Sequence, residues 1–388
     1  MTLCLIRLAA EPDGEYRHVL GDLVAAADPV RLMELLVRGR VLSTLAASLV
    51  DDPSVTLPAW FGQHTAETRT VGRQHGLLQH TLTGRIADAL QQEGIRAIPL
   101  KGTALAAAVH GDLGARQSTD IDLLVSRESM DAAVAVVTEL GWIENRPTAP
   151  DAWLPRLHRV MQHPRHPPVE IHWRVHWYES GYAEEAIERA QPDEEGWTRL
   201  APPDELTFLL LFLARDGFAG LRQAADIAAW WNVVGRPLSP AADVRLIAAR
   251  HPALERALGA SATYAETLAG LDPGSLLASR TALSGSQRVA LRLANPWLRG
   301  SRQQIEAEVS LIDALLSPPG NFTAFVRRNL APPVHEALQR DPGLAAASRG
   351  RLLRARSAHT IRVIARYLLA VRRLGSSATA AFARPSAR

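Results

Sequence analysis

The sequence predicts an α+β fold in which a small mixed sheet is flanked by N-terminal and C-terminal helical segments. Between Ile95 and Trp177, short apolar runs of strand length alternate with helical stretches. On both sides of this unit, apolar residues recur at the spacing of helices. The 388 residues are 47% hydrophobic and 21% charged, which is typical of a globular chain with room for two or three domains.

The N-terminal part predicts helices only. Apolar residues recur at helical spacing from Tyr16 to Val50, and the sequence Asp51-Asp52-Pro53 then interrupts the pattern. A long helix is expected from Gln63 to Gln92, ended by Gly94, because glycine commonly follows a helix.

The central unit predicts the order strand, helix, strand, helix, hairpin. Ser126 is placed to cap the second helix. In chain order, the expected pieces are a strand at Ile95–Leu100, a helix at Ala104–His110, a strand carrying Asp120, a helix through Met130–Leu140, and hairpin strands at Leu157–His163 and Val169–Trp177.

The second half predicts mostly helices, with a linker at Gln191–Pro203 and a disordered end at Ser376–Arg388. The expected helices are Glu184–Ala190, Leu206–Leu213, Leu221–Val234, Leu246–Leu268, Ser286–Leu298, Ile305–Leu316, Val334–Leu338 and Leu352–Leu374. We therefore expect four parts: an N-terminal helical segment 1–62, an α/β domain 63–178, a helical domain 179–348, and an arginine-rich helix with a tail, 349–388.

Composition excludes several classes of protein. Cys4 is the only cysteine, so an intrachain disulfide is excluded. The apolar run Leu206–Ala214 is far shorter than the roughly 20 residues of a membrane span. Residues Met1–Ala10 lack the pattern of a signal peptide. The expected location is the cytoplasm.

The charges are unevenly distributed. Arg349–Arg388 holds ten arginines and no acidic residue, so the rest of this chain of net charge +3 is acidic. The helix in this region has three interpretations: binding to an acidic partner or membrane surface, binding to nucleic acid, or packing of its Ile361–Val371 apolar stripe on the body. Lys101 is the only lysine in the chain.

Asp120 and Asp122 form the most informative pair. Side chains of a strand alternate between faces, so these two carboxylates point the same way while Ile121 points into a core. Neighbouring like charges repel, and a divalent cation such as Mg²⁺ removes that repulsion. Glu170 lies on another expected strand and shares a face with His172. Three such carboxylates can hold two metal ions about 3.5–4 Å apart.

Lys101-Gly102-Thr103 lies where an expected strand ends and a helix begins. Free N–H groups at a helix start attract phosphate, and glycine lets a triphosphate approach the backbone. Thr103 adds a hydroxyl group, and Lys101 can reach a phosphate oxygen. The histidines between His158 and His176 do not show the spacing of a structural zinc site.

Three segments together resemble the polymerase-β-type nucleotidyltransferase superfamily, and within it the bacterial family of largely uncharacterised nucleotidyltransferases. They are Pro99–Thr103, the Arg116 that precedes Asp120–Val125, and Val169–Trp173. The resemblance is close from Ile95 to Trp177 and looser as far as Val234.

The resemblance implies a Mg²⁺-dependent transfer of NMP from an NTP to an acceptor hydroxyl of a small molecule, peptide or RNA, with release of pyrophosphate. By position, it implies two Mg²⁺ ions on Asp120, Asp122 and Glu170. It implies a nucleotide site at Lys101, Gly102, Thr103, Arg116 and His172. Two features depart from the family: the gap between Thr103 and Asp120 is long, and Ala214–Gly217 lacks the histidines often found there. The acceptor is therefore not identified.

Two other classes of function compete with this hypothesis. A nucleotide-binding regulator without turnover would keep the fold, but it would have no need of the third carboxylate, Glu170. An adaptor that binds RNA or a membrane through the arginine-rich helix would use the α/β unit as a scaffold.

Overall fold

The computed structural model describes residues 19–49, 55–145, 157–193, 196–277, 282–298 and 300–330, and part of 350–372. Its helices are α2 (Leu20–Ala25), α3 (Pro29–Gly39), α4 (Leu42–Leu49), α5 (Ala59–Gln92), α6 (Gly102–His110), α7 (Met130–Glu139), α8 (Tyr182–Arg189), α9 (Pro202–Arg215), α10 (Arg222–Trp230), α11 (Arg236–Leu238), α12 (Ala241–Arg250), α13 (Glu255–Ala269), α14 (Gly285–Leu293), α15 (Arg302–Leu316) and α16 (Asn321–Leu330). Its strands are β1 (Ile98–Leu100), β2 (Ile121–Leu124), β3 (Ile143–Glu144), β4 (His158–Gln162), β5 (Val169–His172), β6 (Gln191–Pro192) and β7 (Thr198–Arg199). The α+β prediction is confirmed.

The main sheet is mixed, and its strands lie in the order β1-β2-β5-β4-β3. β2 runs parallel to β5, and every other neighbouring pair is antiparallel. In this register Asp122 lies opposite Leu100 on one side and Glu170 on the other. The predicted hairpin before Trp177 is present as β4 and β5.

The two faces of the sheet pack against different layers. Ile121, Leu123 and Ile171 point into an apolar cluster with the second half of α5 and with α7. Leu100 and Leu124 point to the opposite face, into a larger cluster that includes α9 and α10. Asp122 alternates with Leu123, so its carboxylate lies on the face toward α9.

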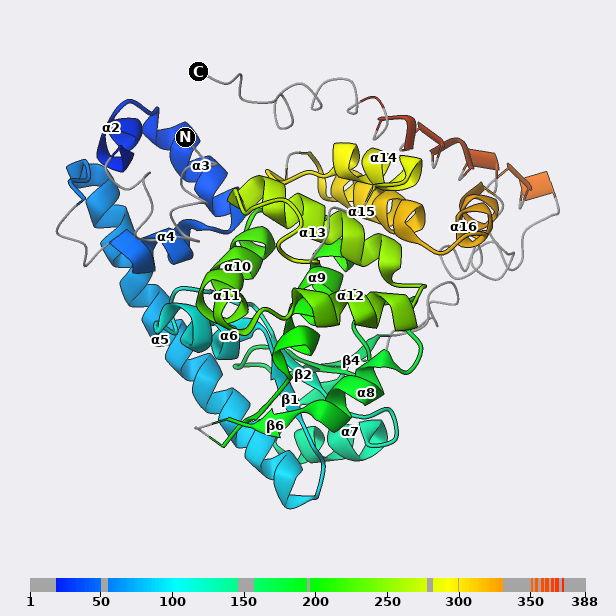
Figure 1. The fold of residues 1–388 in the computed structure, drawn as a ribbon, viewed down its shortest axis with the longest axis horizontal. Helices are drawn as coiled ribbons and strands as arrows, with labels where there is room; N and C mark the ends of the chain where they lie inside the picture. Colours follow the sequence, from blue (N-terminus) through cyan, green and yellow to red (C-terminus); the bar gives the residue numbers. More distant parts are fainter. Residues whose placement is uncertain are drawn as a thin grey trace.

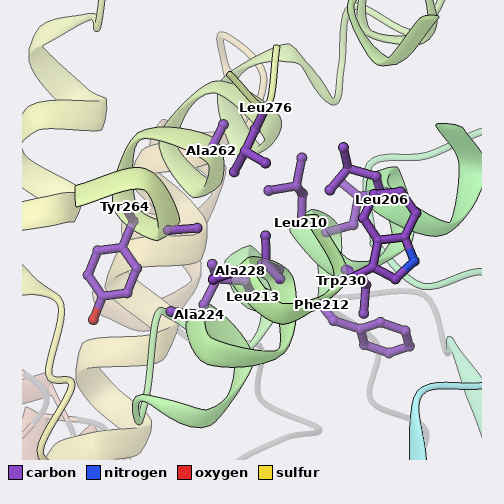
Figure 2. Close-up of a cluster of buried hydrophobic side chains, with 14 of the residues drawn as sticks. Leu206, Leu210, Phe212, Leu213, Ala224, Ala228, Trp230, Ala262, Tyr264 and Leu276 are labelled. Carbon is purple, nitrogen blue, oxygen red and sulfur yellow. The ribbon is translucent and has the colours of Figure 1, made fainter. Parts of the chain in front are cut away.

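α9 is the buried centre of the helical part. Its residues from Leu206 to Ala214 are all buried, as expected for a helix that is apolar all round. Figure 2 shows side chains of α9 meeting those of α10 and α13, with Trp230 and Tyr264 at the two sides. Figure 1 shows α5 running along one side of the molecule, with α13 to α15 lying across from the sheet.

Three differences from the prediction lie in the part of the chain after the main sheet. The expected helix Leu246–Leu268 is divided into α12 and α13 around Pro252, which has no N–H for a helix interior. The expected linker Gln191–Pro203 instead carries the short β6–β7 pair and the start of α9. Helix α16 was not predicted. The expected helix Val334–Leu338 and the tail Ser376–Arg388 lie outside the described residues.

The apolar stripe of the C-terminal helix is exposed. Ile361 is 67% exposed, Ile364 42% and Leu368 63%, and the described arginines Arg354, Arg362 and Arg372 are exposed as well. The interpretation that this stripe packs on the body is therefore wrong for these residues; Val371 lies outside the described part. Among the residues that the structure describes, no helix has the length and apolar character to cross a bilayer.

Candidate active site

The loop between α6 and β2 is pressed against α5 through glycines. A Cβ atom on Gly76 would lie 2.3 Å from the carbonyl oxygen of Leu113, and one on Gly72 would lie 2.8 Å from that of Gly114. Any larger residue would push the loop away, because real Cβ contacts are not this short. The loop therefore reaches Asp120 along a path that α5 defines.

Polar contacts fix the end of this loop. Gln79 of α5 donates to the Ser118 carbonyl at 2.9 Å, and the Ser118 hydroxyl donates to Asp120 at 2.7 Å. Arg116 is 1% exposed and its Nε donates to Asp226 of α10 at 2.8 Å. Arg116 therefore points toward α10, away from the carboxylates that follow it.

Asp120, Asp122 and Glu170 come together as one cluster. Each offers a carboxylate oxygen, and these oxygens all lie within 4.8 Å of one another. The alternation of β2 puts the two aspartates on one face, and the parallel β2–β5 register puts Glu170 beside Asp122. Three carboxylates in so small a space repel one another and attract cations.

Lys101 and His172 neutralise Asp122. The Lys101 ammonium lies 3.2 Å from Asp122 Oδ2, and His172 Nε2 lies 3.0 Å from Asp122 Oδ1. Burial alone would raise the pKa of Asp122, but the Lys101 charge and the His172 hydrogen bond lower it below its usual range. Asp122 is thus ionised although it is almost fully buried.

Glu170 faces two histidines. Its Oε2 lies 3.3 Å from His172 Nε2 and 3.7 Å from His158 Nε2. Burial raises the pKa of Glu170, and the hydrogen bond from His172 and the nearby His158 outweigh this, so the net shift is downward. Burial lowers the pKa of His158 to about 4, with the neighbouring His172 acting in the same direction. His158, Glu170 and His172 form a second group whose ligand atoms could meet at one ion.

The turn before α6 points backbone groups toward this cluster. Lys101 has φ 37° and Gly102 has φ 58°, so two successive residues have a positive φ. Glycine adopts such a backbone conformation readily, whereas a residue with a side chain does not. No side chain among the described residues caps the start of α6, so its first N–H groups are open to an anion. A Cβ on Gly102 would meet nothing within 4 Å, which shows that the turn is open.

α9 contributes residues that sequence reasoning did not assign to the site. The Phe212 ring lies between two cations, with Lys101 Nζ 4.1 Å and the Arg215 guanidinium 4.6 Å from its centroid. Burial lowers the pKa of Arg215, but Asp216 and the carboxylates Asp122 and Glu170 raise it, and the net shift is upward. Nothing in the sequence pointed to Phe212, which lies in the apolar run Leu206–Ala214.

The carboxylate cluster suits a hard divalent cation. Its donors are all oxygens, which Mg²⁺ and similar ions prefer. A narrow cavity of about 10 Å³ lies between α5, α6 and β2, lined by Asp120 and Asp122 together with Lys101, Gly102 and Thr103.

Comparison with known proteins agrees with this geometry. A family model described as "uncharacterised nucleotidyltransferase" matches residues 25–270, more than half of the chain, including the carboxylate cluster, the α6 turn and α9. A search of curated proteins found no match. The chain belongs to the family of uncharacterised nucleotidyltransferases.

Proposed function

We propose that the protein transfers NMP from an NTP to an acceptor hydroxyl and releases pyrophosphate, with Mg²⁺ as its cofactor, in the cytoplasm. The observation that supports this most is the convergence of Asp120, Asp122 and Glu170 beside the open turn at Gly102. A regulator that only bound nucleotide would not need three carboxylates at this point.

Asp120, Asp122 and Glu170 would hold two Mg²⁺ ions through their carboxylate oxygens. When bound, Mg²⁺ neutralises charge on phosphate oxygens and lowers the pKa of a nearby hydroxyl group. Asp122 is ionised in the folded chain, so it is ready to accept a cation without first losing a proton.

The turn and its surroundings would hold the nucleotide. The N–H groups of Gly102 and Thr103 donate to phosphate oxygens at the start of α6. Lys101 leaves Asp122 and pairs with a phosphate oxygen of the nucleotide. His172 orients Asp122 and Glu170, the two carboxylates that it contacts. Arg116 contributes indirectly, because its ion pair with Asp226 fixes the loop that ends at Asp120.

The reaction is an in-line displacement. The acceptor oxygen forms a bond to the α-phosphorus, and the bond from that phosphorus to the oxygen bridging to the β-phosphate breaks. Pyrophosphate leaves with the electron pair of the broken bond. Glu170, which its lowered pKa keeps ionised and which is partly exposed, takes the proton of the acceptor hydroxyl.

The test is incubation with each α-³²P-labelled NTP, Mg²⁺ and lysate fractions, followed by a search for labelled product. We expect label with wild type and loss of at least about 10³-fold in the Asp120→Asn, Asp122→Asn double variant. Asp88→Asn, on an outer part of α5, is the control. Equal labelling by the double variant and wild type would contradict nucleotidyl transfer at this carboxylate cluster.

The exposed stripe of the C-terminal helix supports a second role, docking to an anionic membrane surface. Ile361 and Leu368 are exposed between arginines, which is the pattern of an amphipathic helix that lies on an anionic membrane surface. We expect sedimentation with phosphatidylserine vesicles and not with phosphatidylcholine vesicles, and loss of it in the Ile361→Asp, Leu368→Asp variant. Leu238→Asp, which is 59% exposed elsewhere, is the matched control. Binding that persists in the double variant contradicts this role.

A further inference from the structure

A second, larger cavity borders the carboxylate cluster. Its volume is about 640 Å³, in the range of sites for small organic ligands. Its walls come from the end of α3, the start of α4, the first half of α5, the loop 117–119 and the first residue of α10. Ser118 and Thr119 line it and directly precede Asp120, so the cavity opens next to the first carboxylate.

The walls of this cavity are held in place by contacts of their own. The Leu221 N–H donates to the Gly39 carbonyl at 3.1 Å, which joins the end of α3 to the start of α10. Thr44 of α4 donates to the Ala115 carbonyl at 2.9 Å. His75 of α5 is within 2.9 Å of the Ser118 carbonyl. Segments far apart in sequence therefore form the fixed walls of a half-open cavity.

The cavity is positively charged at one side. Arg222 donates to the Gln117 carbonyl at 2.7 Å, and its buried Nε has no hydrogen-bond partner within the described part of the chain. Burial and the charges of Arg116 and Arg40 lower the pKa of Arg222 to about 10, against the opposing charges of Asp226 and Asp120. The charges of Arg40, in the cavity, and of Asp120, in the carboxylate cluster, therefore both act on Arg222. Glu67, the one carboxylate in the lining, is exposed and accepts from Gln63 at 2.9 Å.

The remaining wall is apolar. Leu36, Val37, Leu42 and Val71 line it, and the two valines are each 59% exposed although they face a cavity. An apolar wall beside two arginines fits a molecule with an apolar body and one anionic group.

We infer that this cavity binds the acceptor, and that the acceptor is a small amphipathic organic anion carrying a hydroxyl group. This inference rests on the proposed nucleotidyl transfer. Arg40 and Arg222 bind the anionic group, the apolar wall holds the body, and the hydroxyl reaches past Ser118 and Thr119 toward Asp120. The acceptor then reaches Asp120 along the loop that precedes it, which contacts with α5 and Asp226 hold in place.

Binding is tested with two dyes of the same shape. The probe 1-anilinonaphthalene-8-sulfonate has an apolar body and an anionic group, and N-phenyl-1-naphthylamine has the same body without the charge. We expect one saturable site that binds the sulfonate about tenfold more tightly than the amine. Equal affinity for the two dyes overturns the inference.

Matched variants locate the site. Arg40→Gln should bring the sulfonate to the affinity of the amine, whereas Arg38→Gln, two residues away on α3 and paired with Glu34, should change neither. Val71→Trp should weaken both dyes at least about tenfold by filling the cavity. Leu77→Trp is its control on α5, since Leu77 is 60% exposed and does not line the cavity. Unchanged binding in Val71→Trp places the dyes elsewhere and overturns the inference.

The acceptor itself is tested by separating lysate small molecules on an anion-exchange resin. Label from α-³²P-NTP should appear with the retained fraction, and Val71→Trp and Arg40→Gln should reduce it at least about tenfold while Leu77→Trp and Arg38→Gln do not. Label only with the unretained or the macromolecular fraction contradicts an anionic acceptor. Displacement of the sulfonate dye by Mg²⁺-NTP alone would show that the cavity holds the nucleotide instead.

Failure of the inference and failure of the proposed function give different results. If no fraction is labelled and the wild type does not bind Mg²⁺-NTP, nucleotidyl transfer is wrong and the acceptor inference falls with it. If Mg²⁺-NTP binds and label is transferred, but the dyes do not distinguish the cavity variants, only the acceptor site is wrong.

Discussion

The two faces of the main sheet are built from alternating residues of the same strands. Both faces bury apolar residues, and one of them also carries the charged cluster around Asp122. Ile121, Leu123 and Ile171 on one face are closed over by α5 and α7. Asp122, Glu170 and His172 on the other face lie under α9. A single step along a strand therefore separates a residue that stabilises the fold from one that can perform chemistry. Apolar burial costs nothing further, whereas each buried charge needs a partner.

Glu170→Gln should produce the largest change. It removes a ligand oxygen charge and the proposed proton acceptor together, so we expect labelling to fall about 10³-fold. Because Glu170 is at the edge of the cluster and its side chain is 22% exposed, the melting temperature should change little. The measurement is labelled transfer beside thermal unfolding; near-normal transfer would remove Glu170 from the mechanism.

Ile171→Ala, one residue along, should show the reverse. Ile171 is fully buried in the cluster with α5 and α7, so truncation should lower the free energy of unfolding by about 3 kcal/mol. Urea unfolding measures this, and transfer per folded molecule at low temperature should stay close to wild type. A loss of transfer as large as that of Glu170→Gln would show that the two faces are not independent.

Lys101→Met should make the stability of the protein depend more strongly on Mg²⁺. It leaves Asp122 with His172 and the more distant charge of Arg215, which we expect to lower the free energy of unfolding by about 3 kcal/mol without Mg²⁺. Millimolar Mg²⁺ should then raise the melting temperature of the variant more than that of wild type, since the ion replaces the lost charge. An equal response to Mg²⁺ in both proteins would show that Lys101 and the ion do not share Asp122.

Asp313→Asn extends the comparison to a buried acid beyond the sheet. Burial raises the pKa of Asp313 to about 7 from 3.8, although the Tyr178 hydroxyl donates to it at 3.0 Å. Between these values the unfolded carboxyl is charged and the folded one is protonated. Stability should therefore fall by about 1.4 kcal/mol for each pH unit as pH rises from 5 to 6.

The Asn variant should lose that part of the pH dependence. Glu179, whose pKa burial raises to about 8, remains and keeps a similar slope of its own. Urea unfolding of wild type and variant at pH 5 and pH 6 makes the comparison. If both proteins lose the same stability over this interval, Asp313 does not titrate as a buried acid.

The parts of the site that depend on local rules could be read from the sequence. The period of two in strands places Asp120 with Asp122 and Glu170 with His172, and a glycine after a strand predicts the turn at Gly102. The structure brings the first three of these residues together as expected. The helix content and the β4–β5 hairpin follow from the same kind of pattern.

The parts that depend on long-range contact could not be read. Arg116 pairs with Asp226, 110 positions later, and no local sequence pattern around either residue predicts this ion pair. Phe212 belongs to an apolar run that reads as helix core, yet two cations lie against its ring. The sequence predicted the apolar stripe that includes Ile361 but not its exposure, because periodicity predicts an apolar face without saying what covers it.

The pairing of Lys101 with Asp122 has a practical consequence, because Lys101 is the only lysine of the chain. An amine-directed acylating reagent can modify no other side-chain ammonium in this protein. Its rate of reaction at this position therefore reports on one atom, Lys101 Nζ, which lies 3.2 Å from Asp122. The molecule carries its own chemical reporter at the centre of the charged face, and each ligand that changes the partner of Lys101 should change that rate.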